Sequence, residues 1–139
     1  MTEVDFYILP DEQPEQRSLF ACRLADRAFR KGHRVYLHTR DEAGAQALDR
    51  LLWEFKPHSF LPHGMLGGED SERIGIGWGD KPGEHEDVMI NLDLEVPAFV
   101  GRFQRVLEIV VQHPTIQAPL RESWRRYKHF GYPVKTNDL

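Results

Sequence analysis

The chain begins with two rounds of one pattern, a short β-rich run followed by a longer stretch whose apolar residues recur every three or four positions. Such a run predicts a strand, and such a stretch predicts an amphipathic helix. Pro10 ends the first run, Gly32 stands where a helix C-terminal glycine belongs, and Asp41 is placed to cap the second helix. The predicted elements are a strand at 4–9, a helix at about 15–31, a strand at 34–39 and a helix from 41 to about 53. Alternation of this kind is typical of βαβ units and a parallel sheet.

The second half of the chain has shorter elements. Apolar runs at 74–78, 88–92 and 106–111 predict strands, with a continued helix as the alternative for the last of them. The other expected elements are a brief extended piece at 59–62, loops at 63–73 and 79–86, a short helix from 97 to about 103, and a helix at 119–130 before Gly131. No internal repeat or long linker interrupts the chain. We therefore predict one α/β domain over residues 1–139, with a mostly parallel sheet flanked by helices.

Size and composition permit this domain to fold unaided. The chain has 139 residues, 40% of them hydrophobic, and a domain of this size buries about two-thirds of its unfolded surface without a metal or disulfide. Cys22 is the one cysteine, which suits a reducing compartment. The opening residues carry no signal-peptide pattern, and no run approaches the ~18 apolar residues of a membrane span. We expect a cytoplasmic protein without membrane contact.

Charge is distributed unevenly along the chain. The formal net charge is −4, which argues against general coating of nucleic acid. From Leu120 to Lys135, however, five positive residues and one negative residue give +4, so the remainder carries −8. A basic terminal patch on an acidic body predicts a local docking site for an anionic partner.

Several enzyme patterns are missing. Residues 74–79 read Ile-Gly-Ile-Gly-Trp-Gly, but the dinucleotide fingerprint and the phosphate loop would have to follow the first strand, where Pro10 stands instead. The seven histidines show no metal-ligand spacing, so we expect no cofactor and no metal. Asp87 and Asp93 flank the strand at 88–92 and leave one rival open, a small α/β nucleotide- or phosphoester-processing enzyme that uses either carboxylate.

The last helix carries the most informative pattern. Arg121, Arg125 and Lys128 form one stripe, beside an apolar stripe that includes Trp124 and Tyr127. A solvated amphipathic helix would explain this arrangement, but cations four residues apart repel one another and no carboxylate neighbour is expected to relieve Arg125. Cations beside aromatic rings suit an acidic peptide with an aromatic anchor. Direct binding of nucleic acid to this helix is a further alternative.

A second apolar cluster includes Trp53, Phe55 and Phe60. Core packing would explain it, yet so many large rings at one helix end also suit a surface that docks a partner.

The chain resembles a known family, the chi subunits of the bacterial DNA polymerase III clamp loader. The resemblance rests on six segments, which occur in the same order along almost the whole chain: 6–9, 28–35, 48–53, 59–63, 88–92, and the Arg126-Tyr127-Lys128 run with Gly131. It implies a Rossmann-like fold without a nucleotide site and a subunit without catalytic activity of its own.

The resemblance also implies two partners. One is the acidic, Phe-ended tail of single-stranded-DNA-binding protein, and the other is the psi subunit, with DNA reached only indirectly. We expect a monomer that forms a heterodimer with psi. Tyr127 and Lys128 match the family's tail-binding pair, and Trp124 replaces its arginine, so that Arg121 or Arg125 takes over that role. The residues expected to face psi are Phe60 and, as neighbours, Trp53, Pro62 and His63.

Overall fold

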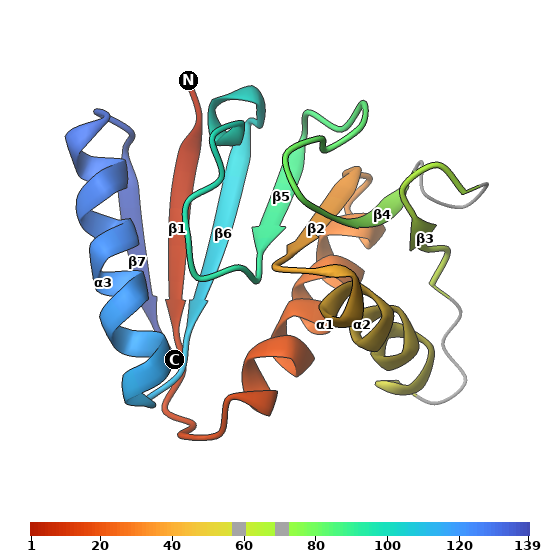
Figure 1. Ribbon diagram of the computed structural model, residues 1–139, viewed down its shortest axis with the longest axis horizontal. Coiled ribbons are helices and arrows are strands. Elements are labelled where there is room, and N and C mark those ends of the chain that lie inside the picture. Colours follow the sequence, from red (N-terminus) through yellow and green to blue (C-terminus); the bar gives the residue numbers. More distant parts are fainter. Residues whose placement is uncertain (57–60, 69–72) are drawn as a thin grey trace.

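The computed structural model describes residues 1–56, 61–68 and 73–139, and its centre is a seven-stranded sheet (Figure 1). The strand order is β3-β4-β2-β5-β6-β1-β7, and every pair of neighbours is parallel. The strands are β1 (Glu3–Ile8), β2 (Val35–Thr39), β3 (Gly64–Met65), β4 (Ile74–Trp78), β5 (Val88–Asn91), β6 (Arg105–Val110) and β7 (Val134–Asp138).

Three α-helices cover the two faces of this sheet: α1 (Glu15–Arg30), α2 (Glu42–Glu54) and α3 (Pro114–His129). Side chains alternate between the faces along a strand, and β1 shows which helix lies on which face. Phe6 packs edge-on against Tyr127 of α3, whereas its neighbour Tyr7 packs against Phe20 of α1. Helices α1 and α2 therefore share one face, and α3 lies on the other. In Figure 1, α3 accompanies β1 and β7, while α1 and α2 lie toward β2 and β4.

Loops complete the α3 face over the centre of the sheet. Tyr36 of β2 is fully buried and stacks on Phe103, with Phe99 and His85 around it. The 3₁₀ helix η2 (Val100–Arg102) holds the segment that carries these phenylalanines. Aliphatic side chains from the inner strands fill the rest of the core, including Val35, Leu37, Ile76, Ile90 and Ile109.

The predicted fold class is confirmed, and most predicted elements match the structure. The Asp41 carboxylate accepts a hydrogen bond from Gly44 N at 2.8 Å, which is the predicted cap of α2. Gly32 has φ of +90°, which favours glycine at a helix end. The run at 106–111 is strand β6 rather than a helix. Of the extended piece expected at 59–62, residues 59 and 60 lie outside the described part of the chain, and Leu61 and Pro62 adopt no regular element.

Three expectations about the second half are corrected. Helix α3 begins at Pro114 rather than Pro119, because the His113 side chain accepts a hydrogen bond from Thr115 N and proline is well tolerated in a first helical turn. Strand β7 was not predicted, since its sequence Val-Lys-Thr-Asn-Asp is mostly polar and lies at a sheet edge. The two-residue strand β3 falls inside the expected glycine-rich loop.

Candidate functional site

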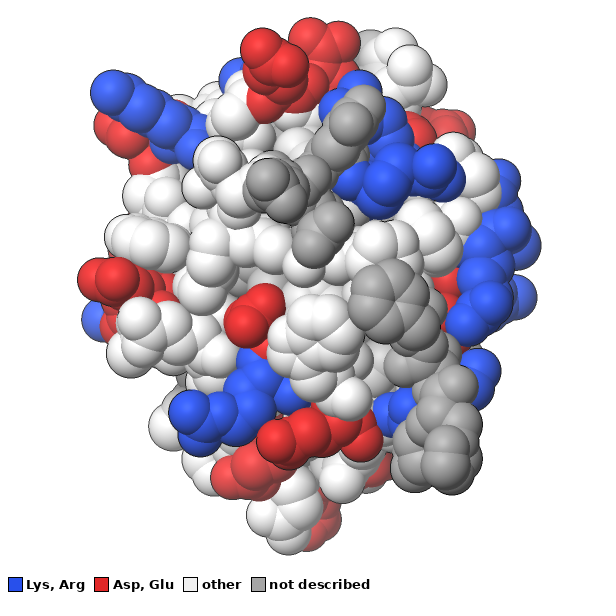
Figure 2. All heavy atoms as spheres, turned by 90° about the vertical axis from the view of Figure 1, so that its right-hand side faces the viewer, with Lys and Arg blue, Asp and Glu red and all other residues white. Residues whose placement is uncertain are grey.

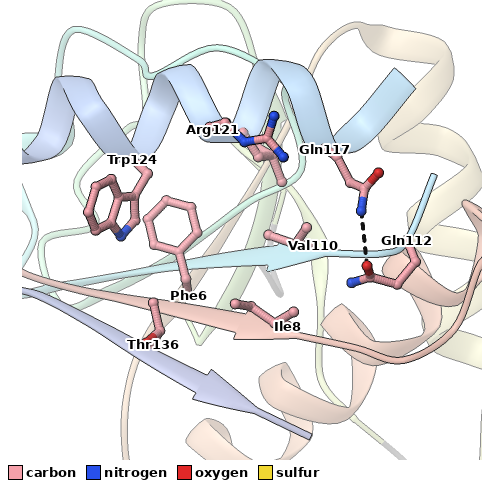
Figure 3. Close-up of a pocket in the computed structure, with 9 residues that line it drawn as sticks. Phe6, Ile8, Val110, Gln112, Gln117, Arg121, Trp124 and Thr136 are labelled. Atoms are coloured by element: carbon pink, nitrogen blue, oxygen red, sulfur yellow. Dashed lines mark hydrogen bonds between the residues drawn. The ribbon is translucent and has the colours of Figure 1, made fainter. Parts of the chain in front are cut away.

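A pocket of about 360 Å³ opens between α3 and the sheet (Figure 3). Its floor comes from three adjacent strands, with Phe6 and Ile8 on β1, Val110 on β6 and Thr136 on β7. The parallel register sets these residues side by side, since Ile8 pairs with Val110 and Phe6 pairs with Thr136. The floor is therefore mostly apolar.

Helix α3 supplies one wall of this pocket. Leu120, Arg121 and Trp124 line the pocket from this helix; Leu120 is buried, and the Trp124 ring lies below the helix on the side of the sheet (Figure 3). A polar end is formed by Gln117 and Gln112, whose side chains share a hydrogen bond of 2.9 Å. We name this the α3 pocket: an apolar hollow with a guanidinium group and an indole at its mouth.

Lys128 extends the positive charge along the same flank of α3. Its ammonium nitrogen lies 4.8 Å from the centre of the Trp124 ring, and that indole is 37% exposed. Such a cation–π contact stabilises the pair and holds the charge over the ring. Arg121, Trp124 and Lys128 are spaced by three and four residues, so they share one helix flank. An anionic ligand with an aromatic end would meet all three.

Arg125 and Arg126 lie away from this pocket. Arg125 forms an ion pair with Glu122, so the expectation that no carboxylate lies near it is wrong. Neither side chain lines the α3 pocket, and the Arg126 guanidinium lies 5.8 Å from the centre of the Phe130 ring. Their positions make both residues useful controls for variants of Arg121 and Lys128.

Tyr127 is part of the core, which corrects its expected place as a direct contact in the tail site. Its side chain is fully buried, and its hydroxyl donates a 2.6 Å hydrogen bond to Glu108 Oε2. Asn91 Nδ2 donates to the same oxygen at 2.9 Å. Tyr127 therefore anchors α3 to the sheet and has no surface that a ligand could contact.

Glu108 is the most perturbed acid of this cluster. Burial raises its pKa from 4.5 to about 7, although the hydrogen bonds from Tyr127 and Asn91 and the charge of Arg17 oppose the rise. Its Oε1 has no hydrogen-bond partner among the described residues. A neutral carboxyl group is therefore favoured over much of the acidic range.

We expect Glu108→Gln to stabilise the protein at pH 8. The folded-state pKa of Glu108 exceeds its unfolded value, so the folded protein keeps a proton that the unfolded chain releases, and this contribution to stability is lost as pH rises from about 4.5 to about 7. The variant mimics the protonated acid at every pH. Its advantage in the free energy of unfolding should grow by roughly 2 kcal/mol between pH 5 and pH 8, measured by urea denaturation. A constant difference across that range would contradict the assignment.

A second candidate surface lies at the end of α2. Trp53 is 50% exposed, and its ring centre lies 4.3 Å from that of His63. His63 is buried, with Nδ1 2.6 Å from Leu61 O, which corrects its expected role as a direct contact: it supports the indole from below. Pro62 is half-buried, and Phe60 lies outside the described residues. Figure 2 views this side of the molecule and shows a largely uncharged centre with charged residues toward its margins.

Arg17 lies across the edge of the sheet where related folds bind nucleotides. In open parallel sheets, ligands bind at the carboxyl ends of the strands. Here the buried guanidinium of Arg17 donates hydrogen bonds to Ile109 O at 2.8 Å and Leu92 O at 2.9 Å, and its charge faces Glu108. Pro14 precedes α1 without a side-chain cap. An arginine held by main-chain carbonyl groups therefore takes the place of a glycine-rich loop.

The two candidate catalytic carboxylates lie at opposite ends of the inner strand β5. Asp87 precedes β5 and accepts hydrogen bonds at its carboxylate from Arg34 N and, in the suitable tautomer, from His33. Asp93 follows β5 and lies 3.8 Å from the buried His38, whose pKa is lowered by burial. Because β5 separates them, Asp87 and Asp93 cannot form one acid–base pair.

Two kinds of feature are absent from the described residues. In the part of the chain that the structure describes, no group of three His, Cys, Asp or Glu residues is arranged to hold a metal ion. No helix there is long and apolar enough to cross a membrane.

Comparison with known proteins gives the family. The family model described as "DNA polymerase III chi subunit, HolC" matches residues 1–135. The chain belongs to the DNA polymerase III chi subunit family. A relative from Pseudomonas aeruginosa, named DNA polymerase III subunit chi, is 46% identical over 100% of this chain and 98% of its own length. Relatives of the same name from Haemophilus influenzae and Escherichia coli are 30% and 26% identical, over 96% and 98% of this chain and 95% and 97% of their own lengths.

Because the chain belongs to this family, it is a chi subunit of DNA polymerase III and takes part in DNA replication. The earlier resemblance to the family is thereby confirmed. Sequence reasoning found the helix wall of the α3 pocket but missed its floor, formed by Phe6, Ile8, Val110 and Thr136. For the buried contact between Glu108 and Tyr127 one signal was available, because Glu108 stands inside an otherwise apolar run.

Proposed function

We propose that this chi-family chain is a non-catalytic adaptor that binds the acidic, Phe-ended tail of single-stranded-DNA-binding protein and connects it, through psi, to the clamp loader. The α3 pocket is the observation that carries the proposal. It joins an apolar hollow to two cations, Arg121 and Lys128, on one helix flank. A tail that ends in Phe supplies a ring, a terminal carboxylate and acidic side chains, and these three features match the pocket.

The exposure of the pocket residues indicates how the binding free energy is divided between ion pairs and ring burial. Arg121 and Lys128 are exposed, so each ion pair with the tail should contribute only about 0.2–1 kcal/mol. Burial of the ring against Phe6, Ile8 and Trp124 should contribute much of the rest, since apolar surface removed from water stabilises by about 25 cal/mol per Å². Salt should weaken the interaction without abolishing it, because screening acts on the charges alone.

Tethering would be the physical mechanism of this adaptor. A coat protein with several tails presents many copies of the ligand near the template, so one weak contact raises the local concentration of the polymerase there. The chain would reach the coated strand through this tail, as a monomer that joins psi in a heterodimer.

Titration of labelled tail peptide against Lys128 variants tests the proposal. We expect Lys128→Ala to lower affinity about two- to threefold and Lys128→Glu to lower it further, because reversal adds repulsion to the loss of a partner. Removal of the peptide's terminal Phe should cost more than Lys128→Ala, since it removes the ring. Equal affinity of the wild type and Lys128→Glu in low salt would show that the tail docks elsewhere. A nucleotide panel in the same assay addresses the rival enzyme hypothesis.

We further propose that Trp53 and Pro62, with Phe60, form the contact to psi. Trp53 supports this because a half-exposed indole that packs against a buried ring is a typical interface anchor. Phe60→Ala should leave the thermal midpoint within a few degrees, since the residue is expected to face psi.

Trp53→Ala should weaken psi binding at least fivefold, because truncation of an interface tryptophan commonly costs more than 1 kcal/mol. Binding of this organism's psi subunit by calorimetry measures the effect. Trp124→Ala is the matched control, as it removes an indole of similar exposure from the other surface. It should weaken tail binding and leave psi binding intact. The reverse pattern would exchange the two assignments.

A further inference from the structure

Among the described residues, no helix covers one face of the β1–β7 half of the sheet. Parallel sheets are as a rule covered on both faces. Here α1 packs mainly on β2, β5 and β6, while α3, on the opposite face, is the described helix that packs on β7. Apart from the contact of Phe20 with Tyr7, the α1-side face of β1 and β7 therefore carries no described helix, and we call it the open face.

An aromatic pair stands on this open face. The ring centres of Tyr7 on β1 and Phe20 on α1 lie 5.6 Å apart, and both side chains are partly exposed. In the parallel register, Tyr7 pairs with Asn137 of β7, and Asp5 pairs with Lys135. Tyr7 is therefore at the centre of the open face, with polar side chains of β7 next to it.

Cations surround this pair. Arg23 lies three residues after Phe20, and Arg27 lies four residues after Arg23, so the three residues share one flank of α1. Burial raises the pKa of the Tyr7 phenol, the charge of Asp5 adds to the rise, and the charges of Arg105 and Arg27 oppose it.

Three of these cations have no acidic partner within the described part of the chain. Arg105 is paired with Glu3 at 2.9 Å and Asp5 at 2.5 Å. Arg23, Arg27 and Lys135 form no ion pair with a carboxylate among the residues that the structure describes. Arg23 and Arg27 are also four residues apart on one helix, where like charges repel by a few tenths of a kcal/mol. The arrangement thus leaves positive charge available beside two partly exposed rings.

We propose that this surface, formed by Tyr7, Phe20, Arg23, Arg27 and Lys135, binds single-stranded nucleic acid directly. Bases stack on the aromatic pair, and phosphates meet the three unpaired cations. Such platforms of aromatic rings in a basic setting are how sequence-tolerant binders hold single strands. An acidic peptide without aromatic groups would use the cations alone and leave the rings idle. The formal net charge of −4 is compatible with the proposal, because only the local charge contacts the strand.

This contact is independent of the proposed adaptor role. The α3 pocket lies on the opposite face of the sheet, so both surfaces are open at the same time. A weak direct contact would hold the strand near the chain while a tail is bound. The failure of either proposal leaves the other standing.

Fluorescence anisotropy of a labelled 15-nucleotide oligothymidylate, in 50 mM salt, tests the inference on the full chain. We expect dissociation constants on the order of 10–100 µM, in the range of non-specific binding. Arg23→Glu combined with Arg27→Glu should weaken binding at least tenfold. Tyr7→Leu keeps an apolar side chain and should weaken it about fivefold or more, since it removes a stacking ring. Three neutralised phosphates give a slope of about −2 for log K against log salt.

Arg125→Glu combined with Arg126→Glu is the matched control, because it reverses two exposed charges on α3. It should leave binding within twofold, and circular dichroism melts confirm that each variant is folded. Absence of binding by the wild type up to 300 µM (about threefold above the upper expected constant) would overturn the proposal. So would an equal loss in the control, or an oligo-aspartate peptide that binds as tightly as the oligonucleotide and is indifferent to Tyr7→Leu.

Discussion

Reversal of both cations at the α3 pocket, Arg121→Glu with Lys128→Glu, is expected to lower tail affinity about thirtyfold. Each reversal removes an exposed ion pair and adds a repulsion of similar size, so that each costs about 1 kcal/mol and the pair about 2 kcal/mol. Anisotropy with a labelled acidic peptide that ends in Phe measures this effect. The loss should shrink in 0.5 M salt, where the charges are screened within a few Å.

The control for this result is Arg126→Glu with Arg125→Glu on the same helix. These side chains lie outside the pocket, with Arg125 held by Glu122 and Arg126 near the Phe130 ring. The control should change tail affinity about two- to threefold at most, through the long-range field alone. Equal losses in both double variants would mean that the tail senses only the overall charge of α3, and the pocket assignment would fail.

Tyr127→Ala should be the most destabilising substitution considered for this protein. The ring is fully buried, and truncation of a buried aromatic side chain costs about 3–5 kcal/mol. The variant also removes the donor to Glu108 Oε2, which leaves a buried acid with one partner fewer. Urea denaturation at pH 7 measures the loss in the free energy of unfolding.

Tyr127→Phe separates the core role of this residue from a role in binding. It keeps the ring and removes only the hydroxyl, so about 1–3 kcal/mol of stability should be lost. Tail affinity should stay within twofold, because the side chain does not reach the surface. A folded Tyr127→Phe protein that no longer binds the tail would place the hydroxyl in the ligand site instead.

The sequence was sufficient for the fold class, because its βαβ alternation and caps are local features. The cap at Asp41 and the glycine after α1 both stand where the pattern placed them. Strand β7 was beyond such reasoning, since a polar edge strand gains its stability from pairing with β1 and not from its own apolar residues. The start of α3 was missed because a proline after a strand indicates only the limit of that strand, whereas Pro114 opens the helix.

The candidate site could be predicted only in part, because the sequence does not show in which direction each side chain of α3 points. Helical spacing placed Arg121, Arg125 and Lys128 on one stripe and Trp124 on the next. In the structure Arg121 and Trp124 line a pocket, and Lys128 lies over the Trp124 ring. The same spacing could not show that Tyr127 faces inward to Glu108, an acid nineteen residues earlier in the chain. Spacing also could not show that three strands supply the pocket floor, because sheet order depends on pairings between distant segments.

The three tryptophans offer the most direct test of the α3 pocket as the tail site. Trp53, Trp78 and Trp124 are all partly exposed and lie on different elements or segments, so their indole N–H signals in a ¹H–¹⁵N correlation spectrum report separate surfaces. Addition of the Phe-ended acidic peptide should shift the Trp124 signal and leave those of Trp53 and Trp78 in place, and the same peptide without its Phe should shift Trp124 far less. A shift confined to Trp53 or Trp78, with Trp124 unmoved at saturating peptide, would contradict the account.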